Sequence, residues 1–326
     1  MSRLSRAAAT LLISNLAGAA LSFVLSALIG RAAGAEGLGV YAAIGAWIFP
    51  LSLIVDFGLS MLLTRDLSQH PEQSDHLLRL SLIERLVIGG AVMAALWLFA
   101  PLLTNDPLAV AGLRISAPMV IILPMFSSFT SVFKARGSMQ PILWLNVGML
   151  ATQVALTAWA FASGYGVMAA ITLNVLTSAG QLAAAWLIWR RRYRQGTAGD
   201  GGKRSALKTL LRRAAPFALA AIFAALQLRV NLIILEASAP IAEAGYYAAS
   251  SRVVEAARLA PNALFGALLP SLAALTASHI MMNSTFRRVQ FGLLLYGAGF
   301  ALVCTLFAAP IIEMIYGADF TPTRPR

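Results

Sequence analysis

The sequence contains a single cysteine, Cys304, which lies within an apolar run. One cysteine cannot form an intramolecular disulfide, and a cysteine-based metal site needs several thiolates. The three histidines, His70, His76 and His279, show no metal-ligand spacing with cysteine or clustered acids. A Walker loop and a dinucleotide fingerprint are also missing, so nothing indicates ATP hydrolysis or nicotinamide chemistry. We therefore expect no metal and no cofactor.

Charge is scarce as well, because only 12% of the residues are charged while 59% are hydrophobic. The mean hydropathy of +0.76 is too high for a soluble domain and indicates a polytopic membrane protein. A helix crosses the hydrocarbon core with about 20 apolar residues, and lipid cannot satisfy an open backbone. The sequence therefore predicts an all-α membrane protein with about nine transmembrane helices, at 8–30, 40–63, 80–103, 108–133, 142–162, 167–189, 214–236, 246–270 and 289–312.

The net charge of +12 comes from 25 basic and 13 acidic residues, and the basic residues are distributed unevenly among the loops. If the N-terminus is cytoplasmic, the inner segments carry 17 Lys and Arg residues, whereas Arg31 is the single one in the outer loops between spans. The positive-inside rule then predicts a cytoplasmic N-terminus. The charge is neither clustered on a soluble domain nor interleaved with stacking aromatics, so it does not indicate nucleic-acid binding.

Two similar strings suggest an internal duplication. GLGVYAA at 37–43 returns as EAGYYAA at 243–249, and a shift of 206 positions places Gly39 on Gly245 and Tyr41 on Tyr247. A basic, glycine-containing segment separates six predicted spans from three, so each string opens the second span of its block. Two blocks in the same orientation are typical of a parallel repeat in a transporter. We predict a six-helix bundle at 1–194, a cytoplasmic linker at 195–213 and a partial second bundle at 214–326.

Several segments carry a family resemblance, among them LIGRAAGAEGLGVYAA, LIVDFGLSMLLTRDLS and the stretch from RAAPFALAAIF to FGALLPSLAAL. The chain resembles the polysaccharide-biosynthesis flippases, the O-antigen transporter branch of the multidrug/oligosaccharidyl-lipid/polysaccharide exporter superfamily. The resemblance covers about residues 8–320. It implies a two-lobed all-α flippase that moves a polyprenyl-pyrophosphate-linked oligosaccharide across the cell (inner) membrane by alternating access, for lipopolysaccharide or another surface polysaccharide.

The same resemblance implies contact with membrane lipid and with polysaccharide-assembly membrane proteins. Such flippases usually have more spans than the nine predicted here, and the tail TPTRPR is neither apolar nor long. We therefore expect a truncated or frame-shifted flippase whose second bundle is incomplete at its C-terminal end, and which is either inactive alone or completed by another chain.

Besides Arg85, four arginines lie within predicted spans, where each arginine at a helix centre costs about 2.5–3.5 kcal/mol on insertion scales. We expect them to face the protein interior or a wet cavity, where a planar guanidinium suits the pyrophosphate of the implied cargo. The alternative for two of them is intrahelical pairing, since Glu255 is three residues from both Arg252 and Arg258. The candidate cationic cavity consists of Arg258, Arg252, Arg229 and Arg114.

Acidic residues within spans have two interpretations. Asp56 could bind a coupling cation or gate the inner side, or it could pair with Arg65 or Arg85, and pairing is favoured. Glu255 is a second candidate for gating or coupling. Glu84 and Arg85 are adjacent near the inner end of the third span, where we expect structural pairing or snorkelling.

Two other function classes stay open. A membrane glycosyltransferase, polymerase or ligase of the same pathway would need a sizeable outer catalytic loop, whereas loops such as TNDP and EASAPIAEAG are short and their acids have no obvious partners. A drug/cation antiporter of the same superfamily fits less well because buried arginines would repel a cationic drug. The sequence therefore favours a transporter that is not an enzyme.

Overall fold

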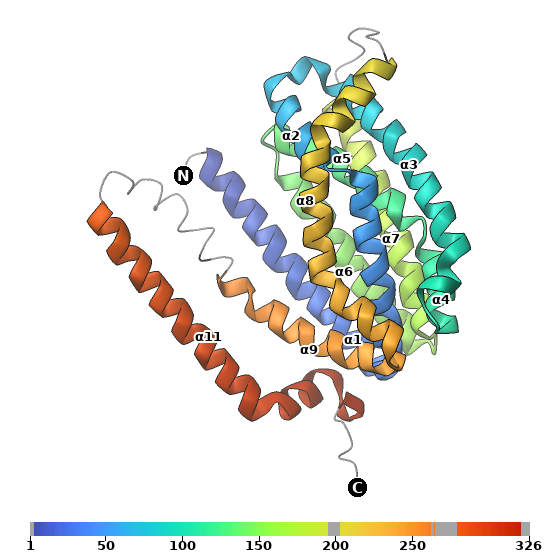
Figure 1. Ribbon diagram of the computed structural model, residues 1–326, viewed down its shortest axis with the longest axis vertical. Helices are drawn as coiled ribbons and strands as arrows, with labels where there is room; N and C mark the ends of the chain where they lie inside the picture. The colour runs from blue at the N-terminus through green and yellow to red at the C-terminus, as the bar shows by residue number, and fades with distance from the viewer. Residues whose placement is uncertain (1–2, 195–202, 262–263, 265–278, 321–326) are drawn as a thin grey trace. The chain divides into compact units, whose positions relative to one another are not determined.

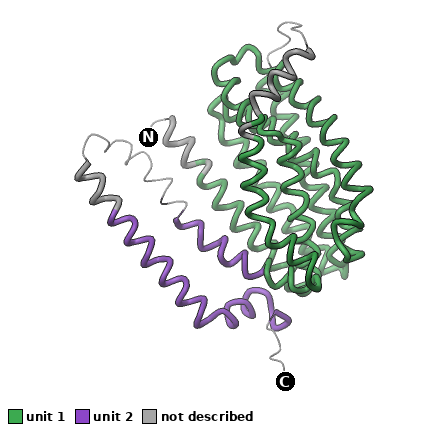
Figure 2. Tube along the Cα trace, in the orientation of Figure 1, with its two compact units in different colours: residues 1–248 green, residues 249–326 purple. Residues whose placement is uncertain are grey.

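The computed structural model describes residues 3–194, 203–261, 264 and 279–320, and the chain is helical throughout these ranges, without strands. It divides into two compact units, residues 1–248 and 249–326, each of which is described by itself (Figure 2). The elements in chain order (Figure 1) are α1 (Arg3–Asp56), α2 (Leu59–Gln69), η1 (Pro71–Gln73), α3 (Ser74–Leu103), α4 (Pro107–Ser116), α5 (Met119–Ala135), α6 (Gln140–Ala162), α7 (Val167–Arg192), α8 (Lys203–Ser238), α9 (Ile241–Ala257), α11 (His279–Tyr316) and η2 (Ala318–Phe320).

The helices confirm the predicted all-α polytopic fold. Within the described residues, seven helical stretches are long and apolar enough to cross a membrane. One of them, Leu12–Asp56, contains two predicted spans, because α1 turns back at Gly34, whose φ is 68°. A positive φ is accessible to glycine at little cost, so the chain reverses there without a separate loop. The predicted span 246–270 corresponds to α9, and most of its remainder lies outside the described residues.

Helices α1–α7 provide the six spans predicted for residues 1–194. The run predicted at 108–133 is divided between α4 and α5, which meet at Ala117 and Pro118. The predicted linker at 195–213 is partly helical, because α8 already begins at Lys203. Its alanine, leucine and lysine residues are good helix formers, which explains why the helix extends beyond the apolar run.

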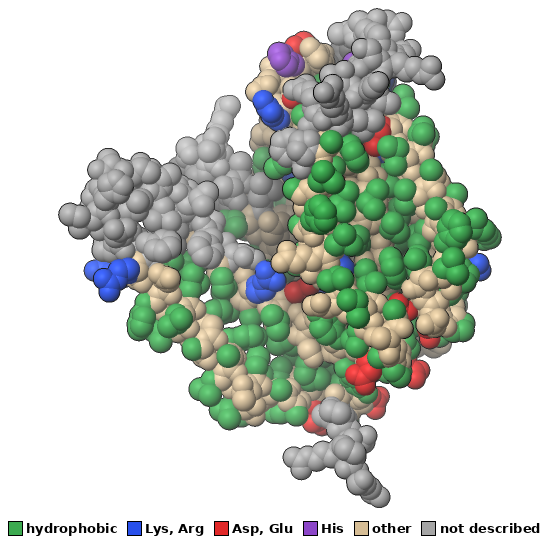
Figure 3. Space-filling view, in the orientation of Figure 1, with side chains coloured by type: hydrophobic (Ala, Val, Ile, Leu, Met, Phe, Trp, Pro, Cys, Tyr) green, Lys and Arg blue, Asp and Glu red, His purple; other side chains and the backbone are tan. Residues whose placement is uncertain are grey.

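Side chains of α2, α3, α5, α6 and α7 form a hydrophobic cluster in the first unit. Aromatic contacts stabilise it, with Phe129 and Trp189 ring centroids 5.9 Å apart and Phe133 and Tyr193 centroids 5.1 Å apart. Many large apolar side chains point outward instead, and they cover much of the face seen in Figure 3. An apolar exterior around a packed interior is expected of helices that lie in lipid.

The first unit has two chemically different ends. At one end, Arg136 Nη2 donates to the Pro71 carbonyl and Tyr193 Oη donates to Ser138 Oγ at 2.7 Å. We name it the basic end after its residues Arg65, Arg79, Lys134, Arg136, Arg190, Arg191, Arg192 and Arg194. The opposite, acidic end contains the turn at Gly34 and the turns at 104–106, 163–166 and 239–240, with Glu36, Asp106, Glu236 and Glu243.

Candidate functional site

The break between α1 and α2 places a carboxylate inside the first unit. Helix α1 ends at Asp56, Phe57 and Gly58 have φ values of 46° and 69°, and α2 begins at Leu59. A left-handed conformation is rare for a bulky residue such as Phe57 and requires support from its surroundings. The Asp56 carboxylate supplies support by accepting from the Ser60 hydroxyl and backbone amide, as an N-cap does. The prediction of one uninterrupted span at 40–63 is therefore wrong at this point.

Arg85 of α3 is fully buried and reaches this break. Its Nη2 donates to Asp56 Oδ1 at 2.6 Å and to Ser60 Oγ at 2.8 Å, and Ser60 Oγ lies 2.6 Å from Ser127 Oγ of α5. The network joins α1, α2, α3 and α5. It confirms the predicted pairing of Asp56 with Arg85, whereas the alternative partner Arg65 is exposed.

Glu84 precedes Arg85 on α3 but has a different environment. Its side chain is 2% exposed, and neither carboxylate oxygen has a hydrogen-bond partner. Consecutive residues of a helix point about 100° apart at 3.6 residues per turn, so Arg85 can bind Asp56 without also binding Glu84. The prediction of pairing or snorkelling is correct for Arg85 as a paired residue and wrong for Glu84.

A second polar cluster lies around Tyr41 of α1. Gln153 Nε2 of α6 and Asn174 Nδ2 of α7 both donate to Tyr41 Oη, at 3.2 Å and 2.7 Å. Nearby on the same two helices, Gln181 Nε2 donates to Asn146 Oδ1 at 2.9 Å. From the sequence, Tyr41 was identified only as part of the repeat, and the four amide residues were not identified. The sequence signal is four amide side chains within predicted apolar spans, which need hydrogen-bond partners in lipid.

Two acids of the short loops at the acidic end lie close to each other, contrary to the expectation that they have no obvious partners. Glu236 of α8 is buried near Thr104, Trp47 and Asp106. Asp106 caps α4 by accepting from the Ala109 amide at 2.8 Å. Across the described part of the chain, no group of three or more His, Cys, Asp or Glu side chains could hold a metal ion.

The two echo strings touch each other within the first unit. A Cβ added at Gly39 would overlap the Ile241 carbonyl oxygen, and a Cβ added at Gly245 would overlap the Ala35 carbonyl oxygen. Ala35 and Ile241 are also 206 positions apart, so the contact is reciprocal under the predicted repeat. A self-complementary contact of this kind is what a two-fold relation between two segments produces. Helices approach this closely only where small residues face each other.

Two of the four candidate arginines belong to the first unit, and each lies against an aromatic ring. The Arg229 guanidinium of α8 is 5.6 Å from the centroid of the Phe49 ring. The Arg114 guanidinium is 5.0 Å from the centroid of the Trp97 ring, and its Nε donates to the Trp97 carbonyl at 3.2 Å. These contacts are cation–π interactions, which stabilise an arginine that leaves water. A cargo-binding role for both residues stays a prediction.

The other two candidates belong to the second unit. Arg252 Nη1 lies 2.8 Å from Glu255 Oε2, which confirms the intrahelical pairing considered for these residues. The side chain of Arg258 is exposed. One acid therefore binds one of the two arginines, and the charge of Arg258 is available to another partner. The roles proposed for Arg252, Arg258 and Glu255 stay predictions.

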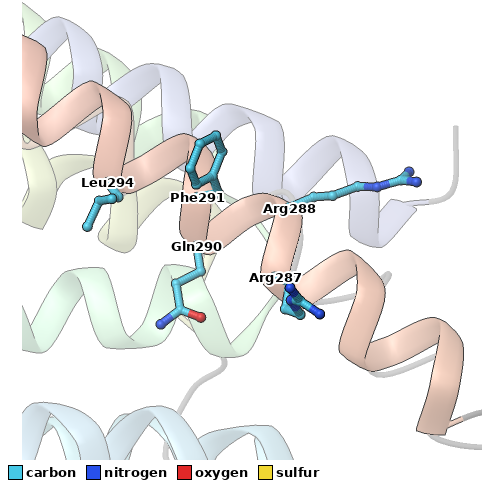
Figure 4. A pocket seen from close by; sticks show the side chains of 5 residues that line it. All are labelled: Arg287, Arg288, Gln290, Phe291 and Leu294. Atoms are coloured by element: carbon cyan, nitrogen blue, oxygen red, sulfur yellow. The ribbon is translucent and has the colours of Figure 1, made fainter.

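A surface hollow of about 630 Å³ is lined by five residues of α11 in the second unit (Figure 4). Arg287 and Arg288 stand at one side of it and the apolar Leu294 at the other, with Gln290 and Phe291 between them. The apolar membrane-crossing stretch of α11 begins at Arg287. This transition from cationic to apolar residues is typical of a membrane–water boundary, where arginines anchor a helix.

Comparison with known proteins identifies a family and several solved structures that this chain resembles. Residues 4–276 match the family described as "Polysaccharide biosynthesis protein". No curated protein matches the chain. A structure of the MATE multidrug transporter DinF-BH in complex with R6G is 13% identical and covers 99% of this chain and 75% of that chain, with a TM-score of 0.70.

Two further structures are similar. A MOP superfamily transporter from Pyrococcus furiosus is 14% identical over 99% of this chain and 74% of that chain, with a TM-score of 0.62. An inward-facing multidrug resistance MATE family transporter of the MOP superfamily is also 14% identical, over 93% of this chain and 71% of that chain, with a TM-score of 0.62. At such low identity the likeness shows the fold alone. The chain has the fold of these transporters and belongs to the polysaccharide biosynthesis protein family.

Proposed function

We propose that this protein is a flippase that moves a polyprenyl-pyrophosphate-linked oligosaccharide across a membrane by alternating access. The observation that carries the proposal is the family match over residues 4–276 together with a transporter fold. The step of polysaccharide biosynthesis that requires a transporter is the translocation of a lipid-linked sugar intermediate across the membrane. The protein then changes no covalent bond and is not an enzyme.

The cargo's pyrophosphate would interact with the four arginines, each of which offers a permanently charged fork for phosphate oxygens. Arg258 is exposed, and Arg252 shares its charge with a half-exposed Glu255, so these two are the strongest candidates. Arg229 and Arg114 lie against aromatic rings and are weaker candidates. Asp56 is occupied by Arg85, which favours a structural role over gating.

The positive-inside rule supports an orientation in which the basic end and the N-terminus face the cytoplasm. The protein would then lie in the cytoplasmic (inner) membrane, where lipid-linked sugars are assembled on the inner face. O-antigen or another lipopolysaccharide component is the proposed destination of the sugar. Other membrane proteins of polysaccharide assembly are the proposed partners.

The fold also supports a second candidate, a drug/cation antiporter, because the MATE structures that it resembles include one described in complex with R6G. The exposed Arg258 argues against a cationic drug in the second unit, since like charges repel. A membrane glycosyltransferase, polymerase or ligase is less favoured, because Asp106, a loop acid that could serve as a base, caps α4.

Complementation tests the proposal. The chain is expressed in cells that lack their own O-antigen or capsule flippase, and surface polysaccharide and sensitivity to cationic dyes are measured together. Restored polysaccharide with unchanged dye sensitivity is the expected result. Increased dye resistance without polysaccharide, at confirmed membrane abundance, would contradict the proposal and favour the antiporter. Cells that contain polymerised but untranslocated product would instead indicate an enzyme.

A further inference from the structure

Three ionisable side chains meet inside the first unit, and one of them is a cation. Asp56 and Glu84 are acidic residues, and Arg85, which follows Glu84 on α3, is in contact with Asp56 at the end of α1. The Arg85 side chain is 0% exposed, Asp56 is 12% exposed and Glu84 is 2% exposed. With both acids ionised, the cluster would hold a net negative charge within a membrane-crossing segment.

The surroundings of Glu84 offer no second cation. The charged groups that act on it are Arg85 of its own helix and Asp56 at the end of α1. Nearby, α2 and α5 contribute hydroxyl groups, since Ser81 Oγ lies 3.0 Å from Ser128 Oγ and Ser60 Oγ lies 2.6 Å from Ser127 Oγ. The other charged side chains described on helices packed against α3 are exposed or engaged elsewhere, namely Arg31, Glu36, Arg65, Asp66, Glu72, Arg114, Lys134, Arg229 and Glu236.

We propose that Glu84 binds a proton, and that Asp56, Glu84 and Arg85 together form a proton-binding site in the first unit. Arg85 directs its Nη2 to Asp56, its Nε and Nη1 have no hydrogen-bond partner, and neither oxygen of the Glu84 carboxyl has one either. A buried carboxylate without a partner is far more costly than a buried carboxylic acid, so the group is neutralised by a proton. One proton for two carboxylates and one guanidinium makes the cluster neutral.

The helix break next to the cluster provides a route for proton exchange. Asp56 is the last residue of α1, and the left-handed Phe57 and Gly58 separate it from α2. Irregular backbone at membrane depth is tolerated where it is buried in protein or lines a water-filled cavity. A movement of α2 that opens the break would bring water to the Asp56–Arg85 pair. One proton then passes between a Glu84 carboxyl oxygen and water, and no other bond changes.

Charge balance gives the site a signature that does not depend on the identity of the cargo. Glu84→Gln keeps the size of the side chain and removes the protonated acid. Asp56→Asn removes the carboxylate that Arg85 binds, so the free guanidinium is expected to hold Glu84 in its ionised form. Both substitutions therefore remove the protonated Glu84. Glu84→Gln replaces the side chain itself, whereas Asp56→Asn acts from the end of α1 by freeing Arg85 to bind the ionised Glu84. Glu72→Gln, at an exposed acid of η1, is the matched control.

Infrared difference spectroscopy of the purified full chain in lipid nanodiscs tests the proposal. At neutral pH, subtraction of Glu84→Gln from the unmodified protein should leave a carboxylic-acid C=O band that shifts in D2O. The band should also disappear in Asp56→Asn and persist in Glu72→Gln. Absence of the band in the unmodified protein would overturn the site, and its persistence in Asp56→Asn would overturn the charge-balanced cluster. A band that does not shift in D2O would overturn exchange. A positive result with failed complementation would leave the site intact and reject the flippase.

Discussion

Two ion pairs of nearly equal length have very different surroundings in the two units. The Arg85–Asp56 pair in the first unit spans 2.6 Å, with side chains 0% and 12% exposed. The Arg252–Glu255 pair in the second unit spans 2.8 Å, with side chains 31% and 46% exposed. The first pair joins α1 to α3 across the helix break, whereas the second connects residues three apart on α9.

The difference shows that the length of an ion pair does not reveal its role. Removal of Arg85 would leave the Asp56 carboxylate buried without a cation, so the first pair is required for the fold. A half-exposed pair contributes little to stability because water competes with it, and its arginine can change partners. The first pair is therefore structural, whereas Arg252 and Arg258 stay the proposed cargo-binding arginines of the second unit.

The largest expected effect comes from breaking the buried pair. Arg85→Ala should lower the free energy of unfolding by about 3–5 kcal/mol, because Asp56 then remains buried without a cation. Thermal unfolding in detergent measures this change. The double variant Asp56→Asn/Arg85→Gln should recover part of the loss because it leaves no buried charge at the break. An Arg85→Ala variant as stable as the unmodified protein would contradict the structural role of the pair.

The glycine contact between the two echo strings should have the next largest effect. Gly39→Ala and Gly245→Ala each place a methyl group on a carbonyl oxygen and should cost about 1–3 kcal/mol, as overpacking does. Gly45, on the same helix α1, has open space around its Cβ position and provides the control. Gly45→Ala should stabilise the helix by up to about 1 kcal/mol. Equal unfolding temperatures for all three variants would refute the close crossing.

The two tyrosines of the echo should differ by a smaller amount. Tyr41→Phe removes the acceptor of the Gln153 and Asn174 amides and should cost about 1 kcal/mol for each hydrogen bond lost. Tyr247 is exposed and accepts one long hydrogen bond, at 3.4 Å from Asn231 Nδ2, so Tyr247→Phe should be nearly neutral. The free energies of unfolding of the two variants, measured under the same conditions, test this difference. A larger loss in the free energy of unfolding for Tyr247→Phe than for Tyr41→Phe would contradict the stabilising role of the polar cluster around Tyr41.

The smallest effect on stability is expected from the exposed pair. Arg252→Ala should change the free energy of unfolding by less than about 1 kcal/mol, because half-exposed ion pairs contribute little. The same unfolding measurement as for Arg85→Ala makes the comparison direct. A loss as large as that of Arg85→Ala would mean that Arg252 is a structural residue and would remove the reason for assigning it to cargo.

The sequence predicted the helical fold well because long apolar runs have one solution in lipid. It also predicted the pairing of Asp56 with Arg85, because charges in adjacent spans need each other. The unpaired state of Glu84 could not be predicted, since it depends on which direction each of two consecutive side chains faces after packing. The same holds for Glu236, which meets Thr104 and Asp106 only once α8 has packed near α3 and α4.

The break at Phe57 and Gly58 was missed for another reason. Asp56-Phe-Gly has a turn-forming composition, but it lies within an otherwise continuous apolar run, and hydropathy dominates in membrane segments. The reciprocal contact of Gly39 and Gly245, by comparison, agrees with the duplication that the echo indicated. Patterns that repeat along the chain were therefore more informative than single charged residues.

Transport of the cargo by the purified protein is the most direct test of a flippase that uses Arg252 and Arg258. Proteoliposomes are loaded with a fluorescent polyprenyl-pyrophosphate oligosaccharide, and its flipping rate is measured for the unmodified protein, for Arg252→Gln/Arg258→Gln, and for the control Arg287→Gln/Arg288→Gln. Flipping by the unmodified protein and by the control is the expected result. A loss of about 10–100-fold is expected in the first variant, which corresponds to the loss of one charge-assisted hydrogen bond of about 1.5–3 kcal/mol in the transition state. Equal flipping by all three proteins would contradict the cargo role of these arginines, and no flipping by any of them would contradict the flippase itself.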